Sequence, residues 1–358
     1  MRAGVVAAPP RVYAWSVRMF HRSVIAATLA TALIAAPSGA RDASADTPRP
    51  PSPWLDQGAQ LRPLEPIPPI AQTPEREDHR LRSILIVSGL YASFTTWAHF
   101  AWYADKIDHG FQWGEDGYFG KNTYAGGADK LGHAWANMVL GRATSRVMRG
   151  QGWGTTGAAV VGGVSAWTLF LFVEIKDGYA YRFSPGDMVF NTAGALFGTL
   201  QELSPRLDEL VDFRVAYAPS DEYLGLWRGE YHGSHKGNSL NIAEDYSGQT
   251  YYLALHLGAL PGVKGAESPA LTALSYLDLG VAFETRKYKP DAPPEAVPTQ
   301  ELFLGVTLDL QKLSDKALRK QRIPRKMAHG VLEVLSPPYT ILPVVSQHRA
   351  ATEPLPEQ

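Results

Sequence analysis

Four stretches between residues 80 and 203 carry apolar side chains at helical spacing, and they set the expected architecture. They are Arg80 to Ala104, Leu131 to Met148, Gly157 to Val173 and Met188 to Leu200. Loops of moderate length join them, so consecutive helices should run in opposite directions. The pattern predicts a four-helix antiparallel bundle over residues 79–207. In the fourth stretch, Gly194 and Gly198 are four apart, a spacing that lets helices approach closely. The first and third stretches are apolar enough to touch a membrane, although a bundle packed in water has the same pattern.

Polar residues lie at the helix ends that this alternation brings to one pole of the bundle. Asp129 and His133 are four apart, as are Asp187 and Asn191, so each pair shares a helix face. The side chains expected at this pole are Asp105, Asp108, Asp129, Lys130, His133, Glu174, Lys176, Asp177, Arg182, Asp187 and Asn191. The opposite pole collects Arg80, Arg82, Arg142, Arg146, Arg149 and Arg206.

The polar pole admits three kinds of chemistry. Four of its residues offer ligand atoms for a divalent metal: Asp129, His133, Glu174 and Asp187. A histidine beside a carboxylate is also a candidate general base. Hydrogen-bonded ion pairs that close the helix ends are the structural alternative. The candidate catalytic cluster is therefore Asp129, Lys130, His133, Glu174, Asp177, Asp187 and Asn191, with its role left open.

After Pro205 the apolar period changes from helical to alternating. Strands are expected at Phe213 to Tyr217, Gln249 to Leu260, Leu274 to Tyr288 and Glu301 to Leu313. Alternation with polar loops predicts an antiparallel sheet of three or four strands over residues 208–313. Such a sheet should pack on the bundle or on lipid, because so few strands cannot close a barrel. The fold class is thus mainly α, a four-helix antiparallel bundle with a small appended antiparallel β-sheet. His256 is expected on the solvent-facing side.

The last segment, residues 314–358, is predicted to be a basic helical tail. Its positive residues are Lys316, Arg319, Lys320, Arg322, Arg325 and Lys326. Such a patch suits anionic lipid head groups, and a solvated helix is the alternative. The prolines within 331–345 favour packing over spanning.

The N-terminal segment is typical of a secretory signal. Arg11, Arg18 and Arg22 precede an apolar run from Val24 to Ala36, and Ala43-Ser44-Ala45 offers a small-residue cleavage site. We predict a signal peptide over residues 1–45, with Met19 an alternative start and an uncleaved anchor the other interpretation. Residues 46–78 are Pro-rich and are predicted to be a linker.

Export conflicts with a simple inner-membrane topology. Removal of the signal places the start of the first helix outside, whereas the arginine-rich pole would favour the cytoplasm. This conflict favours the periplasm or the outer membrane over the inner membrane.

Composition excludes several function classes. The formal net charge is -1 and there is no cysteine. A near-neutral chain offers no electrostatic case for nucleic acid. Without cysteine there are no disulfides, thiol nucleophiles or thiolate metal sites. Metalloprotease, nucleophile-elbow and phosphate-loop motifs are also absent from the sequence.

Several motifs together resemble a known family. They are Asp129-Lys130-x-x-His133, Glu174-x-Lys176-Asp177-Gly178, Phe183-Ser184-x-x-Asp187 and Asn191-x-x-Gly194-x-x-x-Gly198. This set, over Ala128 to Leu203, resembles the YfiM-type predicted periplasmic lipoproteins, a family of unknown function. It is more distantly similar to VanZ-like membrane proteins. The resemblance implies an envelope location and a shared polar site. The chain lacks the cysteine on which a lipoprotein is lipidated.

Two function hypotheses follow. The first is a non-enzymatic, membrane-associated envelope factor that binds lipid or a protein partner, supported by an aromatic group near the polar pole and by the strand faces. The second is a membrane-bound hydrolase or transferase that acts on lipid or cell-wall material through the polar cluster. A divalent metal is the cofactor that this second hypothesis allows.

Overall fold

The structure is a computed structural model that describes residues 79–103, 110–114, 117–230, 242–288, 292–293 and 295–350. The predicted signal peptide and linker lie outside the described residues. So do Asp105 and Asp108, whose expected place at the polar pole is therefore left as a prediction.

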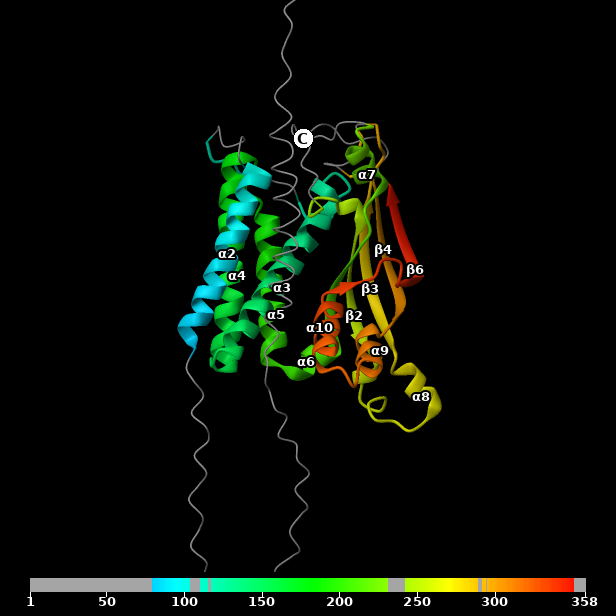
Figure 1. Cartoon of the computed structure of the whole chain (residues 1–358). Helices are drawn as coiled ribbons and strands as arrows, with labels where there is room; N and C mark the ends of the chain where they lie inside the picture. The colour runs from blue at the N-terminus through cyan, green and yellow to red at the C-terminus, as the bar shows by residue number, and fades with distance from the viewer. Residues whose placement is uncertain are drawn as a thin grey trace, which may run out of the picture.

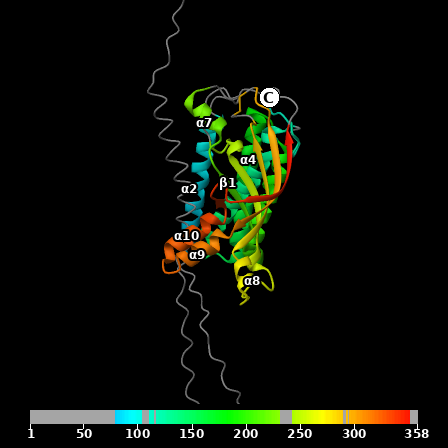
Figure 2. The same ribbon diagram turned by 90° about the vertical axis from the view of Figure 1, so that its right-hand side faces the viewer.

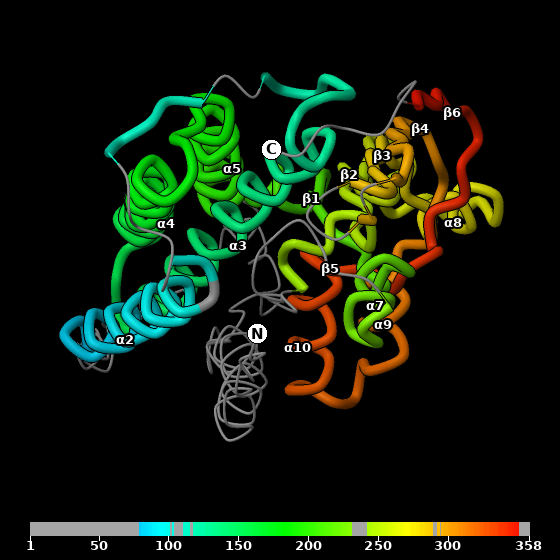
Figure 3. Tube along the Cα trace, turned by 90° about the horizontal axis from the view of Figure 1, so that it is seen from above, coloured from blue at the N-terminus to red at the C-terminus, as the bar shows by residue number. Residues whose placement is uncertain are grey.

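Four long helices form the predicted bundle, and their directions alternate along the chain (Figure 1). They are α2 (Arg80–Ala98), α3 (Ala128–Gly150), α4 (Thr155–Ala180) and α5 (Pro185–Leu203). A π-helical turn, His99–Tyr103, continues α2. Viewed from above, α3 lies between the other bundle helices and the sheet (Figure 3). This central position explains why α3 contacts α2, α4, α5 and three strands.

Glycines allow the helix backbones to approach closely. A Cβ at Gly194 would lie 1.9 Å from the carbonyl oxygen of Ala134, and one at Gly198 would lie 3.0 Å from that of Met138. The four-residue spacing of these glycines predicted this approach, and the structure confirms it. On the other side of α3, a Cβ at Gly162 would lie 2.4 Å from the oxygen of Gly141.

The sheet is larger than expected and mixed. Its order is β5-β1-β2-β3-β4-β6, and β5 pairs parallel to β1 while the other pairs are antiparallel. The strands are β1 (Val211–Tyr217), β2 (Gln249–His256), β3 (Leu277–Arg286), β4 (Thr299–Leu308), β5 (Leu335–Ser336) and β6 (Leu342–Ala350). The prediction of three or four antiparallel strands was wrong because β5 and β6 come from the segment expected to be a helical tail. Their sequence, broken by prolines at 337, 338 and 343, gave no clear alternation.

Short helices surround the sheet (Figure 2). They are α6 (Pro205–Leu210), α7 (Asp221–Arg228), α8 (Pro269–Leu274), α9 (Leu310–Ala317) and α10 (Arg322–Leu332). The basic tail is thus helical in α9 and α10, as predicted. Three one-turn 3-10 helices, Tyr124–Gly127, Tyr246–Gly248 and Leu257–Ala259, complete the description. Pro324 fits in α10 because it falls in the first turn, where a missing N–H costs no internal hydrogen bond.

Three of the six arginines of the second pole form ion pairs: Arg142, which is buried, and Arg146 and Arg149, which are partly buried. Arg142 hydrogen-bonds Glu202, Asp208 and Glu333, and Arg146 hydrogen-bonds Glu202 and Glu333. Burial alone would raise the pKa of Glu333, but the charges of Arg146 and Arg142 lower it to about 2. This network joins α3, α5 and α6 to the residue that ends α10. Arg80, Arg82 and Arg206 are exposed instead.

One described helix, α4, is long and apolar enough to cross a membrane by length and composition. Half of its most apolar window is buried inside the protein, and core helices of soluble proteins pass the same test of length and composition. The length of α4 alone therefore does not establish a membrane span.

Candidate functional site

The polar pole forms where α3 begins, α4 ends and α5 begins. The chain enters α3 through three consecutive residues with positive φ, Ala125, Gly126 and Gly127. The sheet holds this turn: Gln300 donates to the carbonyl of Gly126 at 2.7 Å, and the ring of Tyr288 packs where a Cβ on Gly126 would lie. These contacts fix the first turn of α3, which carries two of the candidate residues.

The start of α5 is fixed by its own sequence. Ser184 caps the helix by accepting from the backbone N–H of Asp187 at 3.0 Å, and Pro185 occupies the first helical position. A carboxylate in this first turn meets the positive end of the helix dipole. The turn therefore presents Asp187 toward α3.

A buried lysine joins the two helix starts. Lys130 is 0% exposed, and its Nζ lies 3.3 Å from Asp129 Oδ2 and 3.1 Å from Asp187 Oδ1. A fully buried ammonium group requires such partners, because its removal from water costs several kcal/mol that only nearby negative charges and hydrogen bonds can offset. The structure thus brings Asp129, Lys130 and Asp187 together.

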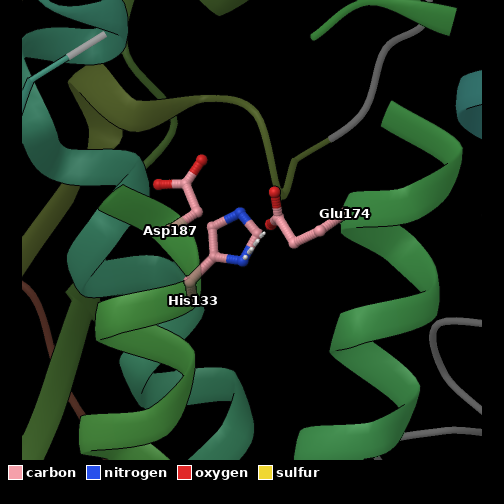
Figure 4. A group of neighbouring side chains, drawn as sticks. All are labelled: His133, Glu174 and Asp187. Atoms are coloured by element: carbon pink, nitrogen blue, oxygen red, sulfur yellow. Dashed lines mark ion pairs between the residues drawn. The ribbon is translucent and has the colours of Figure 1, made fainter. Parts of the chain in front are cut away.

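Next to this group, His133 faces α4 and α5 at once. Its Nδ1 lies 3.1 Å from Asn191 Oδ1 and 3.4 Å from Glu174 Oε1. Asn137, one turn further along α3, also donates to Asn191 Oδ1 at 2.6 Å. Figure 4 shows that His133, Glu174 and Asp187 converge on a common space from three helices. Asn137 was missed from the sequence, although it is four residues from His133.

Asp177 belongs to a neighbouring group on α4. It accepts from the hydroxyl of Tyr103 at 2.8 Å, and the ammonium group of Lys176 lies 4.4 Å from the Tyr103 ring centre. Arg182 is exposed and does not enter the cluster.

Burial shifts the acids of this pole toward their neutral forms. It raises the pKa of Glu174 well above its ordinary value, and the negative charges of Asp187 and Asp177 raise it further. Burial also raises the pKa of Asp177, which the Tyr103 hydrogen bond opposes, to about 7. Acids shifted in this way can hold a proton near neutral pH, which is a property of many functional sites. Structural ion-pair networks share this property, so it does not identify a reaction.

A second feature, an apolar cavity, was not expected from the sequence. It has a volume of about 620 Å³ and lies between the bundle and the sheet. Its walls come from α3, α5 and strands β1 to β4 and β6, and they are apolar or aromatic except for Gln300, Gln347 and Arg349. Leu253, Val281 and Leu302 in its wall are each nearly half exposed, so the cavity opens to the surface.

A third feature corrects an expectation. His256 was expected to face solvent but is 5% exposed. It lies 3.0 Å from Asp212 Oδ2, 2.9 Å from Asp278 Oδ1 and 3.6 Å from Asp309 Oδ2, beside the buried Arg214. Burial would lower the pKa of His256, but its hydrogen bonds to Asp212, Asp278 and Asp309 raise it to about 11. The error arose because this polar sheet face was assumed to be solvated, whereas α9 covers it through Gln311, which donates to Asp212. Charged residues on three paired strands were the signal available in the sequence.

The polar pole falls within a region of the chain that matches a known family. Residues 115–203 match the family described as Predicted periplasmic lipoprotein (DUF2279). The match covers α3, α4 and α5, which carry every candidate residue of the polar cluster. It agrees with the periplasmic lipoprotein resemblance over this segment and with an envelope location. No curated protein and no solved structure matches the chain. The more distant likeness to VanZ-like proteins therefore stays a prediction.

Proposed function

We propose that this protein is an exported, membrane-associated envelope protein that binds the acyl chain of a membrane lipid without transforming it. The observation that carries the proposal is the cavity of about 620 Å³ between the bundle and the sheet. Its volume is within the range of about 300–1,000 Å³ that is usual for small-molecule sites. Its nearly uniform apolar lining suits a hydrocarbon chain better than a polar ligand or a peptide.

The surface around the cavity supports a lipid occupant. Beyond the cavity wall, the same face of the sheet exposes Leu279, Leu304 and Leu308 by about half. Exposed apolar patches of this kind mark contacts with membranes or partners. Arg349, an exposed cation on β6, also lines the cavity and suits an anionic head group. The chemistry thus fits an amphiphile whose tail enters the cavity and whose head stays near Arg349.

Probe binding to the cavity tests this proposal. Ala193 lines the cavity on α5, and Ala193→Trp should fill it and weaken binding of a fluorescent fatty acid by about tenfold or more. Val189→Trp is the matched control, because Val189 is 51% exposed on the same helix and does not line the cavity. A wild-type protein that binds no probe, or equal affinities for wild type and Ala193→Trp, would show the proposal to be wrong.

For the location, we propose the periplasmic side of the envelope at the outer membrane. Arg142, Arg146 and Arg149 are engaged by Glu202 and Glu333, so they offer no free positive charge to orient an inner-membrane helix. The basic helices α9 and α10 supply the charge for anionic head groups instead. Cell fractionation with and without residues 19–45 tests this location, and retention of both forms in the inner membrane would contradict it.

One observation favours the hydrolase or transferase alternative. Glu174 is a buried acid with a raised pKa, and it lies beside the partly exposed His133 at a pole where three helices meet. An acid held neutral next to an imidazole is suited to proton transfer. Incubation of envelope lipid with wild type and His133→Ala, followed by mass spectrometry, separates the two functions. Enzymatic change that the folded His133→Ala variant lacks would favour the enzyme, and unchanged lipid would favour binding alone.

A further inference from the structure

The polar pole contains three side chains with metal-ligating atoms in a compact arrangement. One ligand atom from each of His133, Glu174 and Asp187 lies within 4.8 Å of the other two. Metal–ligand bonds of about 2.1 Å place neighbouring ligand atoms roughly 3–4 Å apart, so a small contraction suffices. The three residues come from three helices whose ends are fixed by the packing described above.

An oxygen of Glu174 lacks the partner that its burial requires. The Glu174 side chain is 1% exposed, and its Oε1 accepts no hydrogen bond. The other oxygen, Oε2, has only a long contact of 3.4 Å with the N–H of Ser184. Buried carboxylate oxygens are nearly always hydrogen-bonded, and an exception calls for an explanation. A cation in the common space next to His133 supplies one.

The charges at this pole also favour a cation. Four carboxylates, those of Asp129, Glu174, Asp177 and Asp187, and two ammonium groups, those of Lys130 and Lys176, belong to this pole. When all six are ionised, negative charges exceed positive ones by two, and the ammonium group of Lys130 contacts Asp129 and Asp187. Such an excess in a buried place must be removed by protons or by a bound cation.

His133 is oriented as a ligand and is reachable from outside. When Nδ1 donates its proton to Asn191 Oδ1, the lone pair remains on Nε2, which points into the space between the two carboxylates (Figure 4). A hydrogen bond on the other ring nitrogen is the usual way in which proteins orient a metal-binding histidine. The His133 side chain is 18% exposed, which gives an ion an entry path.

The other compact group of this type, His256, Asp278 and Asp309, does not meet these conditions. Arg214 lies inside it, with Nη1 3.2 Å from Asp278 Oδ2, and supplies positive charge directly. Each of its three members is already engaged by ion pairs within the group. This comparison distinguishes a satisfied network from a group that has room for a ligand.

We propose that His133, Glu174 and Asp187 bind one divalent first-row transition-metal ion. One imidazole and two carboxylates suit ions such as zinc or manganese better than calcium or magnesium, which prefer oxygen ligands alone. The site is separate from the cavity, so it stands whether or not the chain binds lipid.

Titration of the chelator-treated full-length protein with Zn²⁺ tests the site. Wild type should bind one equivalent, and Glu174→Gln, which keeps the shape and removes the charge, should weaken that binding at least about tenfold. His133→Ala should do the same. His329→Ala is the matched control, since His329 lies exposed in α10 beside Asp315 and should leave binding unchanged. His232 and His235 lie three apart in the sequence and are themselves of a zinc-ligand type, so the titration is repeated in a His232→Ala, His235→Ala background.

Far-UV circular dichroism of each variant and the absorption spectrum of bound Co²⁺ complete the test. A folded Glu174→Gln variant with weaker binding and an altered Co²⁺ spectrum supports the site. Less than one-tenth of an equivalent bound by wild type, or equal affinities for wild type, Glu174→Gln and His133→Ala, overturns it. Ala193→Trp should bind Zn²⁺ as wild type does, so a failure of lipid binding is distinguishable from a failure of this site.

Discussion

Replacement of Lys130 by methionine tests whether the polar pole is held together by its buried cation. Methionine keeps much of the length and apolar volume of the lysine side chain but removes its charge. Lys130 is 0% exposed and contacts Asp129 at 3.3 Å and Asp187 at 3.1 Å, so the variant leaves two largely buried carboxylates without their shared counter-ion. Removal of one member of a buried ion pair typically costs about 3–5 kcal/mol, and we expect a loss of that size at pH 7.

The expected loss depends on pH in a defined direction. Without Lys130, the folded variant must keep two largely buried carboxylates ionised at pH 7 without their shared counter-ion. Protonation of carboxylates at lower pH removes part of that cost. The difference between wild type and Lys130→Met should therefore be smaller at pH 5 than at pH 7. Urea unfolding at both pH values measures it.

Two further variants make the experiment decisive. Lys264→Met removes an exposed lysine that contacts Glu209 at 2.5 Å, and such surface pairs contribute about 0–1 kcal/mol. Asp187→Asn combined with Lys130→Met should recover part of the loss, because coupled neighbours show interaction energies of about 0.5–3 kcal/mol. If Lys130→Met unfolds with the same free energy as Lys264→Met at pH 7, the buried ion pairs do not stabilise the pole and the reasoning fails.

Two other predictions concern packing and the sheet. Gly194→Ala should destabilise the protein by about 1–3 kcal/mol, because its Cβ would meet the Ala134 carbonyl. Gly89→Ala is the control: Gly89 lies in α2 with open space around it, so alanine there should stabilise the protein by about 0.5–1 kcal/mol. Thermal unfolding compares their signs, and equal shifts would contradict the close approach. The folded pKa of His256, about 11, lies above its ordinary value of 6.5, so its stabilisation is complete below pH 6.5 and is lost as pH rises toward 11. Relative to His256→Gln, wild type should lose up to about 1.4 kcal/mol per pH unit between pH 7 and 9 in urea unfolding, and parallel profiles would argue against a charged His256.

The helical half of the molecule was predictable because its signals are local. Apolar periodicity predicted the four helices, and loops of moderate length predicted their alternating directions. That alternation was enough to bring Lys130 and Asp187, 57 positions apart, into contact. The spacing of Gly194 and Gly198 likewise predicted a close helix approach.

The rest depended on long-range pairing that periodicity does not encode. Arg142 was expected at a basic pole for which the sequence indicated no partner, and its partner Glu333 lies 191 positions further along the chain. The edge strand β6 is exposed at every position, so no buried face marked it in the sequence. The cavity was missed for a similar reason, since its walls meet only when α5 and β2 to β4 are both placed.

The first turns of α3 form a wall shared by two otherwise separate compartments. Leu131 and Ala134 face the apolar cavity, while their neighbours Lys130 and His133 face the polar pole. If a ligand in the cavity or an ion at the polar pole tilted this turn, side chains in the other compartment would also move. Both sets of side chains project from the same rigid helix. Substitutions that enlarge the cavity at Leu131 or Ala134 should thus be tolerated only when the ion pairs of Lys130, on the other side of the helix, can shift with the backbone.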